Sequence, residues 1–321
     1  MFIFFFFIVG YFLLELFYFR LAARINIMDL PNHRSSHKII TIRGGGIIFP
    51  IAFLFPLLIE PVNGKMFFFI GLLALAAISF RDDIRSVDSK IRFTVQICSI
   101  GVLVWQLMPD EHVLLVAASC IGFVAWINIY NFMDGVNGIT GLYSLVTIAA
   151  FYWIDIYIQN LLPELYFFSV LAALLVFCFF NVRKQAKCFS GDVGSMSIAY
   201  VISFLLILVC RATNSFVWLS MLGVYAIDGG FTIFCRALRK ENIFEAHRSH
   251  FYQFLANEKK WDHVVVSSLY AGIQLIINIL AIICYRSAQE SAILFLLLVL
   301  FLIYFIFRLR LEGFKRLFNS Y

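Results

Sequence analysis

The chain has 321 residues, of which 62% are apolar and only 14% are charged. Soluble domains contain about 45–50% apolar and about 25% charged residues, so this composition excludes an ordinary soluble protein. The apolar runs are continuous and do not alternate with polar residues, which excludes a transmembrane β-barrel. Because backbone groups in lipid must be satisfied within their own segment, we expect an all-α, polytopic integral membrane protein.

Apolar runs follow one another along the whole chain, and each is expected to form a membrane-spanning helix. Several are shorter than the roughly 20 residues that cross a bilayer, so neighbouring glycine and polar residues must complete them. No soluble insert interrupts the series, and residues 1–321 are therefore expected to form a single transmembrane domain with about eleven helices. The runs are approximately 1–19, 45–60, 66–80, 91–108, 112–130, 139–158, 164–180, 195–210, 213–233, 263–284 and 291–307.

The basic residues predict the orientation of these helices. If the N-terminus lies outside, all 25 lysines and arginines except Lys65, Arg211 and Arg286 fall in inner loops or in the tail. Positive charge favours the cytoplasmic side, so the C-terminus is expected in the cytoplasm. The net charge of +6 is explained by this bias and requires no nucleic-acid partner. The expected catalytic loops on the cytoplasmic face are about 23–44, 81–90, 131–138, 181–194 and 234–262.

The first inner loop ends in the run Arg43-Gly44-Gly45-Gly46. Arginine and lysine side chains here can pair with phosphate oxygens, arginine in a bidentate manner. Three glycines that open a helix allow backbone N–H groups to approach an anion. The alternative is an ordinary basic loop, with glycines that only allow close packing of helices.

Two carboxylates, Asp82 and Asp83, end the third run. Paired carboxylates repel one another and need a cation or arginine neighbours. They could bind magnesium or position an acceptor phosphate, or they could form a solvated helix end.

The segment from Asn128 to Gly141 interrupts an otherwise apolar stretch. A spacing of three residues puts Asn128, Asn131 and Asp134 on one face of a helix. Polar groups at membrane depth usually mark a functional site. A structural polar seam between helices is the alternative.

Two further segments carry polar groups at the same face of the membrane. Asp192 lies between glycines at the start of the eighth run, where its carboxylate could bind magnesium or cap the helix. The largest inner loop contains His247-Arg248-Ser249-His250, in which two histidines three residues apart can share a helical face. This loop could bind a diphosphate or assist the departure of a leaving group, or it could be an ordinary solvated loop.

These motifs, in this order from about Asp29 to Gln253, resemble those of the polyprenyl-phosphate N-acetylhexosamine-1-phosphate transferases. The runs DLPNHRSSH…RGGG and FEAHRSHFYQ are most similar to the bacterial branch that initiates O-antigen synthesis. The resemblance implies transfer of sugar 1-phosphate from a UDP-N-acetylhexosamine to undecaprenyl phosphate, with release of UMP. It also implies a Mg²⁺ cofactor, for which Mn²⁺ can substitute, and a location in the bacterial cytoplasmic membrane with the active site facing the cytoplasm.

Taken with the motifs, the resemblance implies a role for each candidate residue. The ring of Phe189 is expected to stack on uracil. Asn137 stands where many relatives have an aspartate, and an extra residue before Asp192 weakens a uracil-binding role for Asn181; the role of Asp228 stays open. The predicted residues are Asp82, Asp83, Asp134, His247 and His250 for catalysis; Asp192 and Asn131 for the metal; and Arg34, His37, Lys38, Arg43, Gly45, Asn128, Asn137, Phe189 and Arg248 for substrate binding.

The expected mechanism is a single in-line displacement rather than a covalent aspartyl intermediate. A phosphate monoester is mostly dianionic at pH 7, so its attack needs no strong base. The alternative function is an ion-coupled transporter or a flippase that uses Asp82, Asp83 and Asp134. Transporter sites usually lie near mid-membrane between internal repeats, whereas these groups lie at inner helix ends. The donor sugar stays open between N-acetylglucosamine and 6-deoxy sugars such as N-acetylfucosamine or N-acetylquinovosamine. The oligomeric state also stays open, and a homodimer is one possibility.

Overall fold

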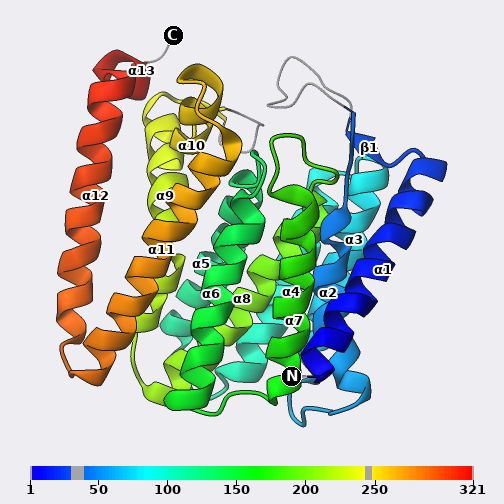
Figure 1. The fold of residues 1–321 in the computed structure, drawn as a ribbon. Helices are drawn as coiled ribbons and strands as arrows, with labels where there is room; N and C mark the ends of the chain where they lie inside the picture. Colours follow the sequence, from blue (N-terminus) through cyan, green and yellow to red (C-terminus); the bar gives the residue numbers. More distant parts are fainter. Residues whose placement is uncertain (1, 30–39, 243–247, 320–321) are drawn as a thin grey trace.

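The computed structural model of the protein describes residues 2–29, 40–242 and 248–319, and it is a bundle of long helices (Figure 1). Each predicted apolar run falls on a helix. The helices are α1 (Phe2–Arg24), η1 (Gly45–Ile47), α2 (Ile48–Leu54), η2 (Phe55–Leu58), α3 (Met66–Ile84), α4 (Ser89–Leu107), α5 (Val113–Phe132), α6 (Ile139–Tyr157), α7 (Glu164–Asn181), α8 (Gly191–Thr213), η3 (Val217–Leu222), α9 (Gly223–Leu238), α10 (Phe251–Gln253), the π-helical turn η4 (Phe254–Glu258), α11 (His263–Arg286), α12 (Glu290–Glu312) and α13 (Phe314–Phe318).

Within the described residues, the only β-strands are two short ones that follow the first helix. Strands β1 (Met28–Asp29) and β2 (Thr41–Ile42) are antiparallel, with Met28 opposite Ile42. The all-α prediction is therefore confirmed apart from this two-residue pair.

Eight helical segments of the described chain are long and apolar enough to cross a membrane: α1, α5, α6, α7, α8, the continuous η3–α9 segment, α11 and α12. The prediction of a polytopic membrane protein is supported, while the count of eleven is not confirmed. The segment Gly45–Leu58 is short, α3 ends in Arg81 and two aspartates, and α4 begins with Lys90 and Arg92, so these three are less apolar or shorter than the rest.

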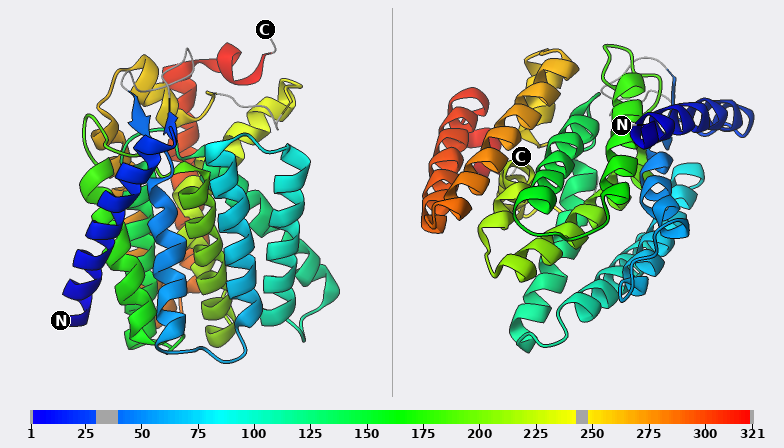
Figure 2. Two further views of the ribbon diagram at one scale, coloured as in Figure 1. Left: turned by 90° about the vertical axis from the view of Figure 1, so that its right-hand side faces the viewer. Right: turned by 60° about the horizontal axis from the view of Figure 1, so that its bottom comes forward.

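The described ends of the chain lie at opposite ends of the bundle (Figure 1). This arrangement is what an odd number of passages would give; the orientation in the membrane stays a prediction. Helices α1 and α12 form opposite edges of the bundle when it is viewed from its lower end (Figure 2). Helix α8 is enclosed, because 89% of its apolar 18-residue stretch is buried inside the bundle. Only 11% of the corresponding stretch of α12 is buried.

The backbones of Gly46 and Gly194 lie in close contact, which brings the end of the first inner loop onto the enclosed helix α8. A Cβ atom added to Gly46 would lie 2.4 Å from the Cα atom of Gly194. The N–H groups of Gly45 and Gly46 donate to the carbonyls of Phe189 (2.8 Å) and Ser190 (3.0 Å). The glycine run therefore packs and hydrogen-bonds against the residues that lead into α8.

Candidate functional site

Five charged side chains meet where α3 ends and α8 begins, at the upper end of the bundle in Figure 1. Arg43 joins Asp83 (Nε to Oδ1, 2.7 Å) to Asp192 (Nη2 to Oδ1, 3.1 Å). Arg92 joins Asp82 (Nη1 to Oδ2, 2.6 Å) to Asp192 (Nη1 to Oδ2, 3.0 Å). Asp192 thus contacts both arginines, and three carboxylates share two guanidinium groups. We call these five residues the carboxylate–arginine cluster.

Asp83 serves this cluster as a buried anchor. Its side chain is fully buried. Its carboxylate accepts the backbone N–H groups of Asp192 (2.9 Å) and Val193 (3.0 Å), so it caps the start of α8 from another helix. Gly191 has a φ of +69°, and a Cβ atom there would lie 2.5 Å from Asp83 Oδ2, so glycine is required on both counts.

Asp82 points to a different neighbour, because consecutive residues of a helix project about 100° apart. Its Oδ1 accepts the backbone N–H of Val87 (2.6 Å), and its Oδ2 contacts Arg92 of α4. The two aspartates that the sequence pairs therefore contact different partners. Arg92 therefore belongs to the site. From the sequence it was recognised only as one of the basic residues that predict the orientation in the membrane.

The three polar residues of α5 and the loop after it contact three different elements. Asn128 donates to Gln96 of α4 (2.8 Å), Asn131 accepts from Ser195 of α8 (2.6 Å), and Asp134 accepts from Thr140 (2.5 Å).

Both carboxylate oxygens of Asp134 have hydroxyl partners. One accepts from Thr140 and the other from Ser190, which precedes α8. Burial raises the pKa of Asp134, and the two hydroxyl groups lower it in part. In this conformation Asp134 joins the α5–α6 loop to the start of α8, and its catalytic role stays a prediction.

Two asparagines join the loop after α5 to the loop after α7. Asn137 donates to the carbonyl of Arg183 (2.8 Å). Asn181 accepts from the N–H of Gly138 (2.7 Å) and donates to the carbonyl of Cys188 (2.7 Å). The side chain of Asn137 is thus engaged with the protein, and the same holds for Asn181, whose uracil-binding role the sequence had already weakened.

The glycine prediction needs a correction. The N–H groups of Gly45 and Gly46 are hydrogen-bonded to the segment before α8, so they do not face a ligand in this conformation. The close approach of Gly46 to Gly194 supports the packing alternative. Within this loop Arg43 contacts the carboxylate–arginine cluster, and Arg34, His37 and Lys38 lie outside the described residues.

The prediction for the histidine loop also needs a correction. His250 does not lie within a helix: it is the N-cap of α10, with extended backbone at φ −69° and ψ 147°. Its side chain is buried, with Nδ1 3.8 Å from Asp228 Oδ1 and its ring 6.5 Å from that of Phe132. Arg248 is half-buried in the same segment, and His247 lies outside the described residues.

Within the described chain, no group of three or more histidine, cysteine, aspartate or glutamate residues is arranged to hold a metal ion. Magnesium, however, needs only one or two carboxylates, with water and phosphate supplying its other oxygen ligands. Asp192 belongs to the cluster, and Asn131 contacts Ser195, which follows Asp192 by three residues on α8. Both side chains offer oxygen donors. The chemistry of this donor set suits magnesium.

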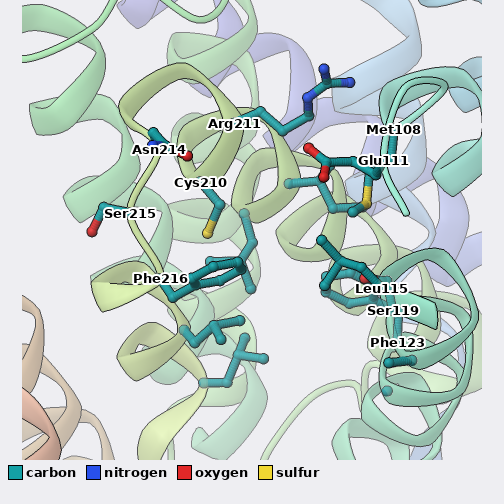
Figure 3. Close-up of a pocket in the computed structure, with 16 residues that line it drawn as sticks. Met108, Glu111, Leu115, Ser119, Phe123, Cys210, Arg211, Asn214, Ser215 and Phe216 are labelled. Carbon is teal, nitrogen blue, oxygen red and sulfur yellow. The ribbon is translucent and has the colours of Figure 1, made fainter. Parts of the chain in front are cut away.

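A separate cavity of about 620 Å³ lies at the opposite end of the bundle, where α8 ends. Its walls come from the beginning of α5, the end of α8 and η3, and they are mostly apolar. Glu111, Arg211 and Asn214 lie at its polar side (Figure 3). Since the charged groups that could handle phosphates are at the other end, we take the carboxylate–arginine cluster as the candidate active site.

Comparison with known proteins supports this choice. The model of glycosyl transferase family 4 matches residues 66–210, a range that contains every member of the cluster except Arg43. A probable undecaprenyl-phosphate N-acetylglucosaminyl 1-phosphate transferase of Bacillus subtilis (strain 168) is 26% identical over 256 residues, which cover 74% of this chain and 71% of the relative.

Other relatives align over shorter stretches. An undecaprenyl-phosphate alpha-N-acetylglucosaminyl 1-phosphate transferase of Escherichia coli (strain K12) is 25% identical over 214 residues, 59% of this chain and 56% of the relative. A phospho-N-acetylmuramoyl-pentapeptide-transferase of Leuconostoc citreum (strain KM20) is 39% identical over 75 residues, 23% of either chain. The family model and these relatives agree with the motif order, and they support a relationship of this chain to the polyprenyl-phosphate N-acetylhexosamine-1-phosphate transferase family.

Proposed function

We propose that this protein transfers N-acetylhexosamine 1-phosphate from a UDP-sugar to undecaprenyl phosphate and releases UMP. The observation that carries the proposal is the contact of Asp192 with both Arg43 and Arg92 at the start of α8. A cluster with several carboxylates and guanidinium groups suits a reaction between two phosphate-bearing substrates. The Bacillus and Escherichia relatives are named for the acceptor and for the type of transfer.

The proposed reaction is a displacement at the β-phosphorus of the donor. A bond forms between an oxygen of the acceptor phosphate and the β-phosphorus, and the bond from that phosphorus to the bridging oxygen breaks. UMP leaves with the electron pair of the broken bond. Because both reactants are anions, positioning and charge neutralisation should dominate catalysis. Arg43 and Arg92 could supply part of this neutralisation by turning from carboxylates toward phosphate oxygens.

We further propose that the enzyme needs Mg²⁺, held mainly by Asp192 with help from Asn131. When bound there, the ion would neutralise phosphate charge and help to orient the two substrates. Asp82 is a candidate to position the acceptor, since it is less enclosed than Asp83 and contacts Arg92, which also contacts Asp192. Asp83 is better suited to holding α8 in place, because its oxygens already accept two backbone N–H groups.

The apolar cavity could receive the tail of the acceptor. Helices α5 and α8 carry Asn131 and Asp192 at one end and line the cavity at the other. Leu206, a cavity residue of α8, follows Asp192 by 14 positions, which corresponds to about 21 Å along a helix at about 1.5 Å per residue. A long polyprenyl chain whose phosphate lies at the cluster could extend along these helices as far as the cavity.

The distribution of basic residues supports a cytoplasmic location for the cluster, where UDP-sugars are available. The product would be the first lipid-linked sugar of an O-antigen or a similar cell-envelope polysaccharide in a bacterial inner membrane. The donor could carry N-acetylglucosamine or a 6-deoxy N-acetylhexosamine.

The test is UMP release by purified protein with undecaprenyl phosphate and Mg²⁺, measured across a panel of UDP-sugars. Asp192→Asn should lose activity. Asp155→Asn is a matched control, because Asp155 is also largely buried and accepts two backbone N–H groups, but at the other end of the bundle. Release with one donor, lost in Asp192→Asn and retained in Asp155→Asn, supports the proposal. Absence of release from folded wild-type protein with every donor would contradict it and revive the transporter alternative.

A further inference from the structure

A fully buried carboxylate, Asp228 of α9, organises the segment that bears His250. It accepts the backbone N–H groups of Phe251 (3.0 Å) and Tyr252 (3.3 Å), at the start of α10. It also accepts the hydroxyls of Tyr270 of α11 (2.6 Å) and Tyr304 of α12 (2.9 Å). One side chain thus connects three long helices to a short loop helix.

The charge of Asp228 is matched by Arg308, whose Nη1 lies 3.8 Å from Asp228 Oδ1. Arg308 donates to the hydroxyl of Tyr304 (2.8 Å), to the carbonyl of Ser249 (2.7 Å) and to Glu312 (2.5 Å). Burial of such charges is costly unless they are paired and hydrogen-bonded, as they are here. Apart from Ile293, Arg308 is the only residue of α12 that is buried, so this otherwise peripheral helix reaches the interior mainly through it.

The same segment is fixed on its other side to the loop after α5. The hydroxyl of Tyr252 donates to the carbonyl of Phe132 (2.8 Å). A Cβ atom on Gly135 would lie 2.3 Å from that hydroxyl, so the tyrosine lies directly against the loop that contains Asp134. The ring of His250 packs near the rings of Phe132 and Tyr252.

Helix α10 (Phe251–Gln253) runs directly into the π-helical turn η4 (Phe254–Glu258), and together they form a helical segment of eight residues. A helical segment of this length is marginal in isolation, because fixing its first turn costs more than one hydrogen bond returns. The two N–H groups of this turn that Asp228 accepts therefore supply an external anchor. The orientation of the preceding residues, Arg248 to His250, therefore depends on this anchor.

We propose that Asp228 is a positioning residue of the donor-binding loop, and that Tyr304 and Arg308 of α12 hold Asp228 in place. This inference rests on the proposed function, since it assigns the loop around Arg248 and His250 to the UDP-sugar. Asp228 itself touches no substrate. It holds the loop against the end of α5, so that donor affinity depends on a helix at the edge of the bundle.

The experiment compares wild type with Asp228→Asn, Tyr304→Phe and the double variant. Tyr166→Phe is the control, because Tyr166 is a buried tyrosine whose hydroxyl donates to the carbonyl of Glu60 in a different part of the bundle. The first readout is the Michaelis constant of each substrate in the UMP-release assay. The second is the rate of tryptic cleavage after Arg248 in detergent, with and without UDP as the probe, which needs no turnover.

Asp228→Asn should raise the KM for the UDP-sugar by at least about tenfold, because a misplaced loop loses contacts that need close alignment. The KM for undecaprenyl phosphate should stay within about twofold. Cleavage after Arg248 should become at least about tenfold faster, and UDP should protect less. Tyr304→Phe should have a smaller effect of the same kind, and little further effect in the Asp228→Asn background, since coupled residues are non-additive. Tyr166→Phe should behave like wild type.

Unchanged cleavage and an unchanged donor KM in folded Asp228→Asn protein would overturn the inference, as would an equal rise in both KM values. If Asp228→Asn does not fold, Tyr304→Phe carries the same test, and wild-type cleavage and donor KM in that variant would overturn the inference. Failure of the proposed function is distinguishable, because wild-type protein would then release no UMP while the cleavage readout would still report on the anchor.

Discussion

The neighbouring aspartates Asp82 and Asp83 should respond differently to the same substitution. In Asp83→Asn, the amide keeps one acceptor oxygen, so one of the two N–H groups at the start of α8 loses its acceptor. A hydrogen bond to a charged group contributes about 1.5–3 kcal/mol. The lost ion pair with Arg43 adds less, since that side chain is 34% exposed and solvent screens it. We expect a loss of about 2–4 kcal/mol in the free energy of unfolding.

Asp82→Asn should cost much less stability. The asparagine can still accept the N–H of Val87 through its remaining carbonyl oxygen. The lost partner is Arg92, which is 29% exposed, and such ion pairs contribute about 1 kcal/mol or less. UMP release should nevertheless fall strongly in Asp82→Asn, because Asp82 is the member of the pair that is available to position the acceptor.

The measurement is thermal unfolding of both variants in one detergent, beside UMP release at a temperature where both are folded. In domains of about 150–250 residues, 1 kcal/mol shifts the Tm by about 2–4 °C. At about 2 °C per kcal/mol, Asp83→Asn should unfold about 4–8 °C below wild type and Asp82→Asn about 2 °C or less below it. Equal shifts in the two variants, or a larger shift for Asp82→Asn, would refute the division of roles.

Three further outcomes are expected. Gly46→Ala should lower stability by about 1–3 kcal/mol through overpacking against Gly194, whereas Gly101→Ala, where an added Cβ meets nothing within 4 Å, should not; thermal unfolding compares them. Burial raises the pKa of Asp134, so the folded chain keeps this proton to a higher pH than the unfolded chain. Stability should therefore decline as pH rises from about 4, the ordinary aspartate value, through the raised one, and Asp134→Asn should flatten that decline in Tm measured across pH. Chelation of divalent ions should reduce UMP release to the level of Asp192→Asn, and added Mg²⁺ should restore it in wild type only.

The helices and the grouping of the motifs were predictable from the sequence. Continuous apolar runs predict helices because lipid offers no partner for backbone groups, and every run lies on a helix. The shared location of Asp82, Asp192 and Arg43 was predicted from the lysine and arginine count alone. That inference succeeded because it depends on which end of a helix a residue occupies, and not on contacts between side chains.

The individual contacts were not predictable, because they join residues far apart in the chain. Nothing in the spacing indicates that Asp83 would cap a helix that begins more than 100 residues later. The glycines at 44–46 suit both an anion site and close packing, and only the approach of Gly194 decides between these. A helical face shared by His247 and His250 was one possibility, but His250 is an N-cap, and Asp228 on another helix accepts the N–H of the residue that follows it.

The balance of charge in the cluster bears on how substrates could enter. Three carboxylates share the two guanidinium groups of Arg43 and Arg92, so these five side chains carry one excess negative charge when all three carboxylates are ionised. An excess of negative charge disfavours a diphosphate and favours a cation. A divalent ion would reverse the sign of the excess and leave the arginines free to exchange a carboxylate for a phosphate oxygen, since guanidinium groups pair with either. The carboxylates of the cluster are therefore the groups that could bind the cation during the reaction, and its arginines are the groups that could bind the diphosphate.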